Sequence, residues 1–426
     1  MPQLDAGLRR SRTAAVLVIA AAVCLTSCNR PVPRQTQTRP PAPVFQPPQP
    51  GVRAQPAVPI VRVLLAGGPL QRCNVATTGG YFIQLDGKTV FSSAMALTAQ
   101  IGLQQGSWTI NQMQTGSGTM DIVSSGGMVQ YEGTTYRGWL RLLRVDGGFM
   151  VLNHVDLEDY LAGVLARELY PAWPIASYEA LAVAARTYAI YQAKTIGRTR
   201  GYDLGADQGS QVYGGFAAET AKSRQAVADT FSLVLTCHQD GKDQIFKTQY
   251  SSACGGVTNP AAVLRDAPLV EPLSGGQACS DCTGCRFYRW DTVRVPKSDV
   301  YAAIKRMFPA AEQLRGISWV QVESATPSGR PIWLVVHGLT GAGLRMRAED
   351  MRLAMLRSGN ASLPRLPSMN CRIETSGDCL EFSQGKGFGH GVGLCQWGSQ
   401  AKANAGWTYR QILAYYYPSS KVIQGY

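Results

Sequence analysis

The sequence is poor in charged residues, and especially in acidic residues and histidine. Of its 426 residues, 16% are charged, with 28 Asp and Glu against 41 Lys and Arg, and only four are histidine. We find no internal repeat, and neither composition nor spacing is typical of collagen, a coiled coil or wholesale disorder. The 45% of hydrophobic residues can form the core of one large domain or two modest ones.

The scarcity of acid leaves a formal net charge of +13. Such a surplus suits a polyanionic partner, either nucleic acid, anionic lipid or the anionic polymers of a bacterial wall. The sequence lacks a Lys/Arg-rich run interleaved with aromatic residues, so nucleic acid is not the partner we expect.

The N-terminal segment indicates the compartment. Residues 9–12 hold three arginines, and the apolar run that follows, residues 13–25, is too short to span a bilayer comfortably. The run ends in the letters LTSC, which resemble the lipobox of bacterial lipoproteins, where the cysteine is lipidated and becomes the new N-terminus. We therefore expect residues 1–28 to be a lipoprotein-type signal peptide with its lipobox. The mature chain is expected to be a lipoprotein of the cell envelope, anchored to a membrane through Cys28 and located in the periplasm or at the outer membrane. An ordinary signal peptide with an incidental cysteine is the alternative.

The rest of the chain divides by composition. Residues 29–59 are rich in Pro, Gln, Arg and Thr, which predicts a disordered linker with polyproline character. Short runs of strand-forming residues separated by glycines predict a mainly β region at 60–155. The remainder, 156–426, alternates helical and strand patterns. The predicted fold class is α+β, with one domain at 60–426.

Apolar spacing locates several helices within that domain. It predicts helices at 157–168 and 176–194, separated by two prolines, and a short one at 409–417. Residues 210–270 have strand-like runs, and 298–356 combine a helix with strands.

Several motifs in the domain are specific in combination. They are LEDYLAGV at 157–164, ELYPAWP at 168–174, AVAARTYA at 182–189, QVYGG at 211–215, GFGHGVGLCQWG at 387–398, and QIL at 411–413 leading to YP at 417–418. From about residue 60 to 418 the chain closely resembles the stage II sporulation protein D (SpoIID) family, which includes proteins named amidase enhancers, and the motifs follow in family order. The resemblance implies lytic transglycosylase activity on peptidoglycan, in the founding members on glycan stripped of its stem peptides.

The resemblance places the catalytic glutamate of the family on Glu168. Hydrolysing glycosidases normally need two carboxylates. A lytic transglycosylase instead uses the C6 hydroxyl of muramic acid as the attacking group, so one glutamate can protonate the leaving oxygen and then accept the hydroxyl proton. An apolar pocket that raises its pKa would assist, and Leu165, Leu169, Tyr170 and Trp173 could provide one. The alternative is a solvated glutamate near a helix end.

Four further residues are candidates for substrate binding. His390 lies in a run with glycine at every second position, which permits close approach to a sugar chain, and Gln396 follows it; a structural hairpin is the alternative. Tyr250 begins the segment YSSACGG, which matches Tyr-His-Ser-x-Ser-Gly-Gly of the family, with Ser251 in place of the histidine. Arg186 lies within an apolar helix and needs a partner, for which an ion pair is the leading interpretation and substrate contact the other.

The cysteines allow two interpretations. Cys279, Cys282 and Cys285 have a spacing that suits zinc or an iron–sulfur cluster, with Cys254 as a fourth ligand. In an exported protein disulfides are the stronger expectation, so we predict no cofactor and a surface loop away from Glu168. A second disulfide could join Cys371 and Cys379. Where relatives carry ligands for zinc, this chain has Gly205, Gly209 and Ser210, so that metal site is not expected either.

Three functions therefore compete. The leading prediction is a lytic transglycosylase acting on peptidoglycan glycan strands, and Glu168 favours it. The second is a glycan-binding protein that stimulates a cell-wall amidase without cutting. The third, supported only by the cysteines, is a thiol or metal protein. The expected partners are glycan strands, an amidase, and a membrane through the lipid anchor.

Overall fold

A computed structural model describes residues 57–426 of the chain. The predicted signal peptide with Cys28, and the predicted linker up to residue 56, lie outside the described residues. No helix within the described part is long and apolar enough to cross a membrane.

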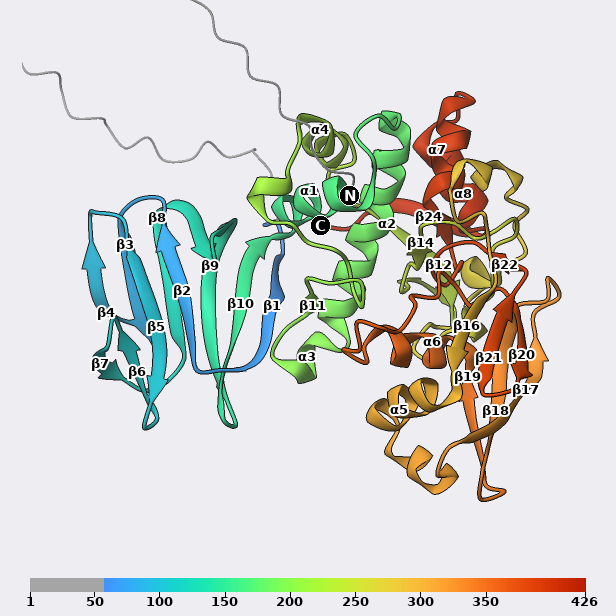
Figure 1. Ribbon diagram of the computed structural model, residues 1–426. Helices are drawn as coiled ribbons and strands as arrows, with labels where there is room; N and C mark the ends of the chain where they lie inside the picture. Colours follow the sequence, from blue (N-terminus) through green and yellow to red (C-terminus); the bar gives the residue numbers. More distant parts are fainter. Residues whose placement is uncertain (1–56) are drawn as a thin grey trace, which may run out of the picture. The chain divides into compact units, whose positions relative to one another are not determined.

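One large sheet contains every strand of the N-terminal region (Figure 1). Its order is β11-β1-β10-β9-β8-β2-β5-β6-β7, with β3 and β4 added beside β8. The strands are β1 (Ile60–Leu70), β2 (Arg72–Thr77), β3 (Tyr81–Leu85), β4 (Lys88–Ser93), β5 (Thr98–Gln104), β6 (Ser107–Ile110), β7 (Met113–Gly116), β8 (Met120–Tyr131), β9 (Thr134–Val145), β10 (Gly148–Asp156) and the short β11 (Leu204–Gly205).

Tight turns give this sheet its antiparallel order. Asp86 and Gly87 join β3 to β4, and Glu132 and Gly133 join β8 to β9, and all four residues have positive φ angles. Two-residue turns of this kind match the right-handed twist of the strands on either side. The predicted mainly β region is therefore confirmed, and its last strand leads directly into the first helix.

Two helices follow the sheet and bury much of their surface. The helix α1 (Leu157–Glu168) begins where the side chain of Asp156 accepts a hydrogen bond from the Glu158 amide at 2.8 Å. It ends at Glu168, because Leu169 is extended and proline follows. The helix α2 (Ile175–Lys194) is buried on nearly all sides, which its small alanine side chains permit. The two predicted helices agree with these bounds to within one residue.

The segment after α2 agrees only in part with the prediction of strand-like runs at 210–270, because it contains a helix as well as strands. It contains the helix α4 (Ala221–Asp229), the strands β12 (Leu233–Gln239), β13 (Lys242–Ile245) and β14 (Tyr250–Ser251), and otherwise irregular or 3-10 structure. The helix α4 is amphipathic only over two turns, so its periodic pattern is weak. The capping box at Thr220 and Ser223 is the local sign of a helix N-terminus, and the strand interpretation overlooked it.

The C-terminal elements return to the first core. The strand β24 (Ser420–Gln424) pairs with β12, and the helices α7 (Gln396–Asn404) and α8 (Tyr409–Tyr416) lie against α2. The short β23 (Leu394–Cys395) runs parallel to β14, with Tyr250 opposite Leu394 and Ser251 opposite Cys395. This pairing brings the YSSACGG segment beside the glycine-rich run.

A second hydrophobic core is formed by residues between 293 and 382. Its elements are β16 (Val293–Pro296), α5 (Lys297–Met307), β17 (Ile317–Ala325), β18 (Pro331–Gly338), β19 (Gly343–Arg347), α6 (Ala348–Leu356), β20 (Arg372–Ser376) and β21 (Cys379–Ser383). Figure 1 shows these strands and helices together, in yellow to red. The chain as described is α+β, as predicted.

Candidate active site around Glu168

Glu168 is the last residue of α1, and both of its carboxylate oxygens are hydrogen-bonded. Oε1 accepts a bond from the Val212 backbone amide at 3.1 Å, and Oε2 accepts one from the side-chain amide of Gln396 at 2.9 Å. Residues from three separate sequence motifs therefore meet at one carboxyl group.

The pKa of Glu168 is raised above its ordinary value. Burial is the main cause, because it penalises the charged form, while the bonds from Gln396 and Val212 act in the opposite direction. Its position at a helix C-terminus disfavours negative charge as well. A carboxyl group in this setting is protonated over a wider pH range than a solvated one, as a general acid requires.

Three aromatic rings from the segments that carry Glu168 and Gln396 pack against one another. Tyr170 and Trp173 follow Glu168 in sequence, and Trp397 follows Gln396; their ring centroids are 5.1 to 5.7 Å apart. Tyr170 is 58% exposed, whereas Trp173 is buried. A sugar ring could lie against such an aromatic surface. Of the four residues predicted to form an apolar pocket, Leu165 and Leu169 are buried as well.

Tyr250 is a third polar neighbour of the site. Its hydroxyl oxygen is buried and forms no hydrogen bond of standard geometry within residues 57–426, although the side chain of Gln211 is near enough to lower the pKa of Tyr250 slightly. Burial, and next the negative charge of Glu168, raise the pKa of Tyr250 well above its ordinary value, so the hydroxyl stays protonated. An unpaired donor close to the carboxyl group is available to a ligand.

His390 lies in the glycine-rich run but does not hydrogen-bond to Glu168. Its Nδ1 accepts a bond from the Val392 amide at 3.0 Å, which leaves the other ring nitrogen as the protonated one. Burial lowers the pKa of His390 to about 4, so the ring is neutral near pH 7. In the structure, the His390 side chain therefore helps to order the backbone of its own loop.

The glycines of this run are required because neighbouring segments of the chain approach their backbone closely. A side chain at Gly391 would collide with the Asn259 amide, and one at Gly393 would collide with the Gln249 carbonyl oxygen; both glycines have positive φ. The hydroxyl of Ser251, at the position where the family has histidine, accepts a bond from the Gly391 amide at 3.0 Å.

Arg186 does not reach the site. Its side chain is fully buried and forms a salt bridge of 2.6 Å with Glu158, together with a bond to the Leu233 carbonyl oxygen at 3.1 Å. The suggestion that it contacts substrate is wrong, because nothing outside the protein can touch it. The ion pair, which was the leading interpretation, is what the structure contains.

The predicted surface position of the cysteine loop is also wrong. Cys279 and Cys282 are fully buried and Cys285 is 5% exposed. Nor is the loop remote from Glu168, since Cys279 and Cys282 lie close to Cys395, the residue before Gln396. All nine cysteines among the described residues are unpaired.

The predicted disulfide between Cys371 and Cys379 is excluded by strand register. In the β20–β21 hairpin, Ser376 pairs with Cys379 beside the turn, whereas Arg372 pairs with Ser383 at the far end. Cys371 precedes Arg372, so the two cysteines are separated by roughly 13 Å or more along the strand. A disulfide needs Cα atoms less than about 7 Å apart.

Sequence reasoning missed three residues of the site. Val212 acts through its backbone amide, which no side-chain pattern discloses. Trp397 could have been found, since it follows Gln396 within the motif. Arg330, buried within the second core, bonds to the Gly389 carbonyl oxygen at 3.4 Å and to Glu349 at 2.9 Å; only the tertiary structure brings it to the glycine-rich run.

Comparisons with known proteins agree with these motifs. A family model described as SpoIID, stage II sporulation protein, matches residues 145–237, a segment that contains α1, Glu168 and α2. An uncharacterised protein of Brachyspira hyodysenteriae is 28% identical over 292 residues, which cover 68% of this chain and 73% of that protein.

Two relatives from Bacillus subtilis have names that describe a role. Stage II sporulation protein D is 26% identical, with 64% of this chain and 75% of the relative aligned. The amidase enhancer is 23% identical, with 61% of this chain but only 40% of the relative aligned. Residues 145–237 therefore match the SpoIID family model, and the chain is similar to proteins named stage II sporulation protein D and amidase enhancer.

Proposed function

We propose that the protein is a lytic transglycosylase that cuts peptidoglycan glycan strands with Glu168 as its acid and base. The observation that carries the proposal is the environment of this one carboxyl group. Its pKa is raised by burial, and its oxygens accept hydrogen bonds from Gln396 and Val212. The neighbouring residues Tyr170 and Trp397 bring two aromatic rings together.

The electrostatics of Glu168 favour this reaction over hydrolysis. Within residues 57–426, no second acidic group contributes to the raised pKa of Glu168. Glycosidases that use water as nucleophile commonly hold two carboxyl groups about 5–10 Å apart. An internal nucleophile removes the need for the second one.

The reaction then proceeds in two proton transfers. Protonated Glu168 donates its proton to the glycosidic oxygen as the bond from C1 of muramic acid to that oxygen breaks. The resulting carboxylate is stabilised by the amides of Gln396 and Val212. It takes the proton of the C6 hydroxyl while the C6 oxygen forms a bond to C1. The products are a 1,6-anhydromuramic end and a free hydroxyl on the departing sugar, and Glu168 ends protonated again.

The location of the protein belongs to the same proposal. An enzyme that acts on the wall must be exported, and the sequence resembles a lipoprotein precursor with Cys28 as its lipidated residue. We propose a membrane-anchored protein of the cell envelope, with the segment after Cys28 as its tether.

A second function has one observation in its favour. A relative is named amidase enhancer, and a glycan-binding protein that stimulates an amidase could use the same aromatic surface without cutting. This alternative predicts binding of glycan strands with no new ends.

Mass spectrometry of soluble products separates the two functions. Purified glycan strands, with and without stem peptides, are incubated with the wild type, with Glu168→Gln, and with Glu179→Gln, a control on α2 in which a half-buried glutamate is changed in the same way. We expect anhydromuramic ends from the wild type and the control, and a rate lower by about 10²–10⁴-fold with Glu168→Gln. Reducing ends would contradict the mechanism, and full activity of Glu168→Gln would favour the enhancer.

A further inference from the structure

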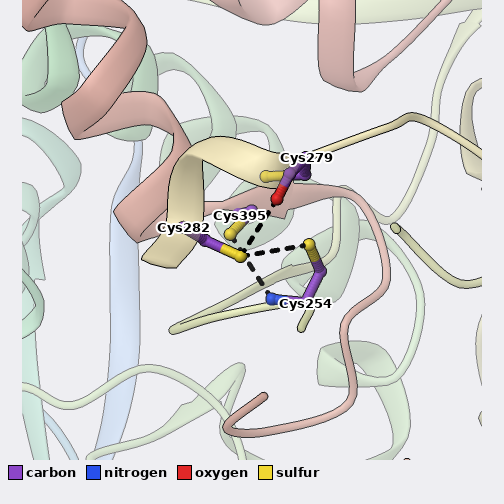
Figure 2. Close-up of side chains that lie close together, drawn as sticks. All are labelled: Cys254, Cys279, Cys282 and Cys395. Atoms are coloured by element: carbon purple, nitrogen blue, oxygen red, sulfur yellow. Dashed lines mark hydrogen bonds between the residues drawn. The ribbon is translucent and has the colours of Figure 1, made fainter. Parts of the chain in front are cut away.

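Four cysteine thiols meet in the interior beside the candidate active site (Figure 2). Cys254 follows β14. Cys279 directly precedes the 3-10 helix η4 (Ser280–Gly284), and Cys282 lies within it. Cys395 ends β23 and caps α7. Their sulfur atoms all lie within 4.8 Å of one another. Each of the four residues is at most 1% exposed.

The spacing of the sulfurs is that of a tetrahedron around one ion. A zinc–sulfur bond is about 2.3 Å long, so two sulfurs of a tetrahedral site lie about 3.8 Å apart. The sulfurs of Cys254 and Cys282 are 3.8 Å apart. Two separate disulfides would require two close pairs but no mutual proximity of all four atoms.

Polar groups of the protein contact two of the four sulfur atoms. The sulfur of Cys395 accepts hydrogen bonds of 3.4 Å from the backbone amides of Cys254 and Gly398. The hydroxyl of Tyr416 lies 3.2 Å from the sulfur of Cys279. Such outer contacts orient metal ligands and stabilise their charge.

We infer that Cys254, Cys279, Cys282 and Cys395 bind one zinc ion in a closed structural site. Four thiols release their protons to solvent as the ion binds. Four sulfur ligands and full burial leave no position for water, so the ion takes no part in catalysis. Cys285, which the sequence places in the same C-x-x-C spacing, is not one of the four.

The ion would connect segments that are distant in sequence. It joins the YSSACGG segment to η4 and to the start of α7, two elements that are also joined by a salt bridge of 3.0 Å between Lys402 and Asp281. Cys395 is followed directly by Gln396, whose amide holds Glu168. The zinc site therefore sets the position of Gln396. Only this last step rests on the proposed function.

Metal content tests the inference without an activity assay. The full chain is purified without added metal and analysed by plasma mass spectrometry, where we expect about one zinc per chain. Alkylation in denaturant with chelator but no reductant should then label all four cysteines. Absence of zinc with these cysteines labelled only after reduction would show disulfides and overturn the site, and stoichiometric iron would overturn the choice of zinc.

Variants locate the ion. Cys282→Ser should lose the zinc, whereas Cys285→Ser, which changes a buried cysteine of the same loop, should keep it. If Cys282→Ser fails to fold, the wild-type measurement still decides. Glu168→Gln should keep its zinc. A wild-type protein that holds zinc but is inactive would refute only the transglycosylase proposal. A wild-type protein that is active but holds no zinc would refute only the metal site.

Discussion

The side-chain amide of Gln396 donates a hydrogen bond of 2.9 Å to Oε2 of Glu168, across 228 positions of sequence. The bond links the end of α1 to the first residue of α7. It stabilises the charged form of Glu168, whereas burial disfavours the charged form and raises the pKa of this carboxyl group. The balance between these two effects sets the pH range of the proposed reaction.

Removal of this bond should move the alkaline limit of activity to higher pH. Glu168 must be protonated to begin the reaction, so the rate falls as pH rises through its pKa. Gln396→Leu removes a contact that lowers this pKa, so the pKa rises and the falling limb of the pH–rate profile shifts upward. Gln400→Leu on the same helix is the matched control, and a limb that stays in place with Gln396→Leu contradicts the assigned role.

Tyr250→Phe should reduce activity while leaving stability nearly unchanged. The hydroxyl forms no hydrogen bond of standard geometry within residues 57–426 and has only a weak interaction with the Gln211 side chain, so its loss should cost little stability. Tyr417→Phe is the counterpart: its hydroxyl donates to the Gln249 carbonyl oxygen at 2.7 Å, and its loss should cost about 0.5–1.5 kcal/mol of unfolding free energy without a specific effect on rate. Urea unfolding and the product assay, applied to both variants, check the contrast; unchanged activity in Tyr250→Phe would remove this residue from the site.

Arg186→Leu should destabilise the fold strongly. The change leaves Glu158, which is 12% exposed, without its buried partner, and loss of one member of such a pair costs about 3–5 kcal/mol. Arg224→Leu, which breaks an ion pair at a side chain that is 50% exposed, should cost less than about 1 kcal/mol. Denaturant midpoints measure both, and an Arg186→Leu protein of normal stability that fails to bind glycan would reverse the structural assignment.

Cys28→Ser should release the protein from membranes. Residues 29–59 contain no apolar run that could anchor the chain in place of a lipid. Fractionation of cells that express the variant should place it in the soluble periplasmic fraction, whereas Cys379→Ser, a change at a half-buried cysteine of β21, should stay with the membranes. Wild-type protein in the soluble fraction would show that Cys28 carries no lipid.

Local information in the sequence was enough for the fold class and for the long helices, while the resemblance to a known family supplied the candidate acid. The bounds of α1 follow from a capping aspartate at one end and prolines after the other, which act within a few residues. The motif around Glu168 is local as well. Helix α4 was missed because two amphipathic turns carry too weak a periodic pattern.

Only the tertiary structure decided which side chains meet. Whether Arg186 faces a substrate or an internal partner depends on Glu158, and one-dimensional spacing cannot distinguish the two. The cysteines show the same limit: the sequence suggested Cys279, Cys282 and Cys285 with Cys254 as a fourth ligand, whereas the fold places Cys395 with the others and leaves Cys285 out. The reason is physical: strand pairing between β14 and β23 brings distant segments together. The sequence around Cys279 contains no information about that pairing.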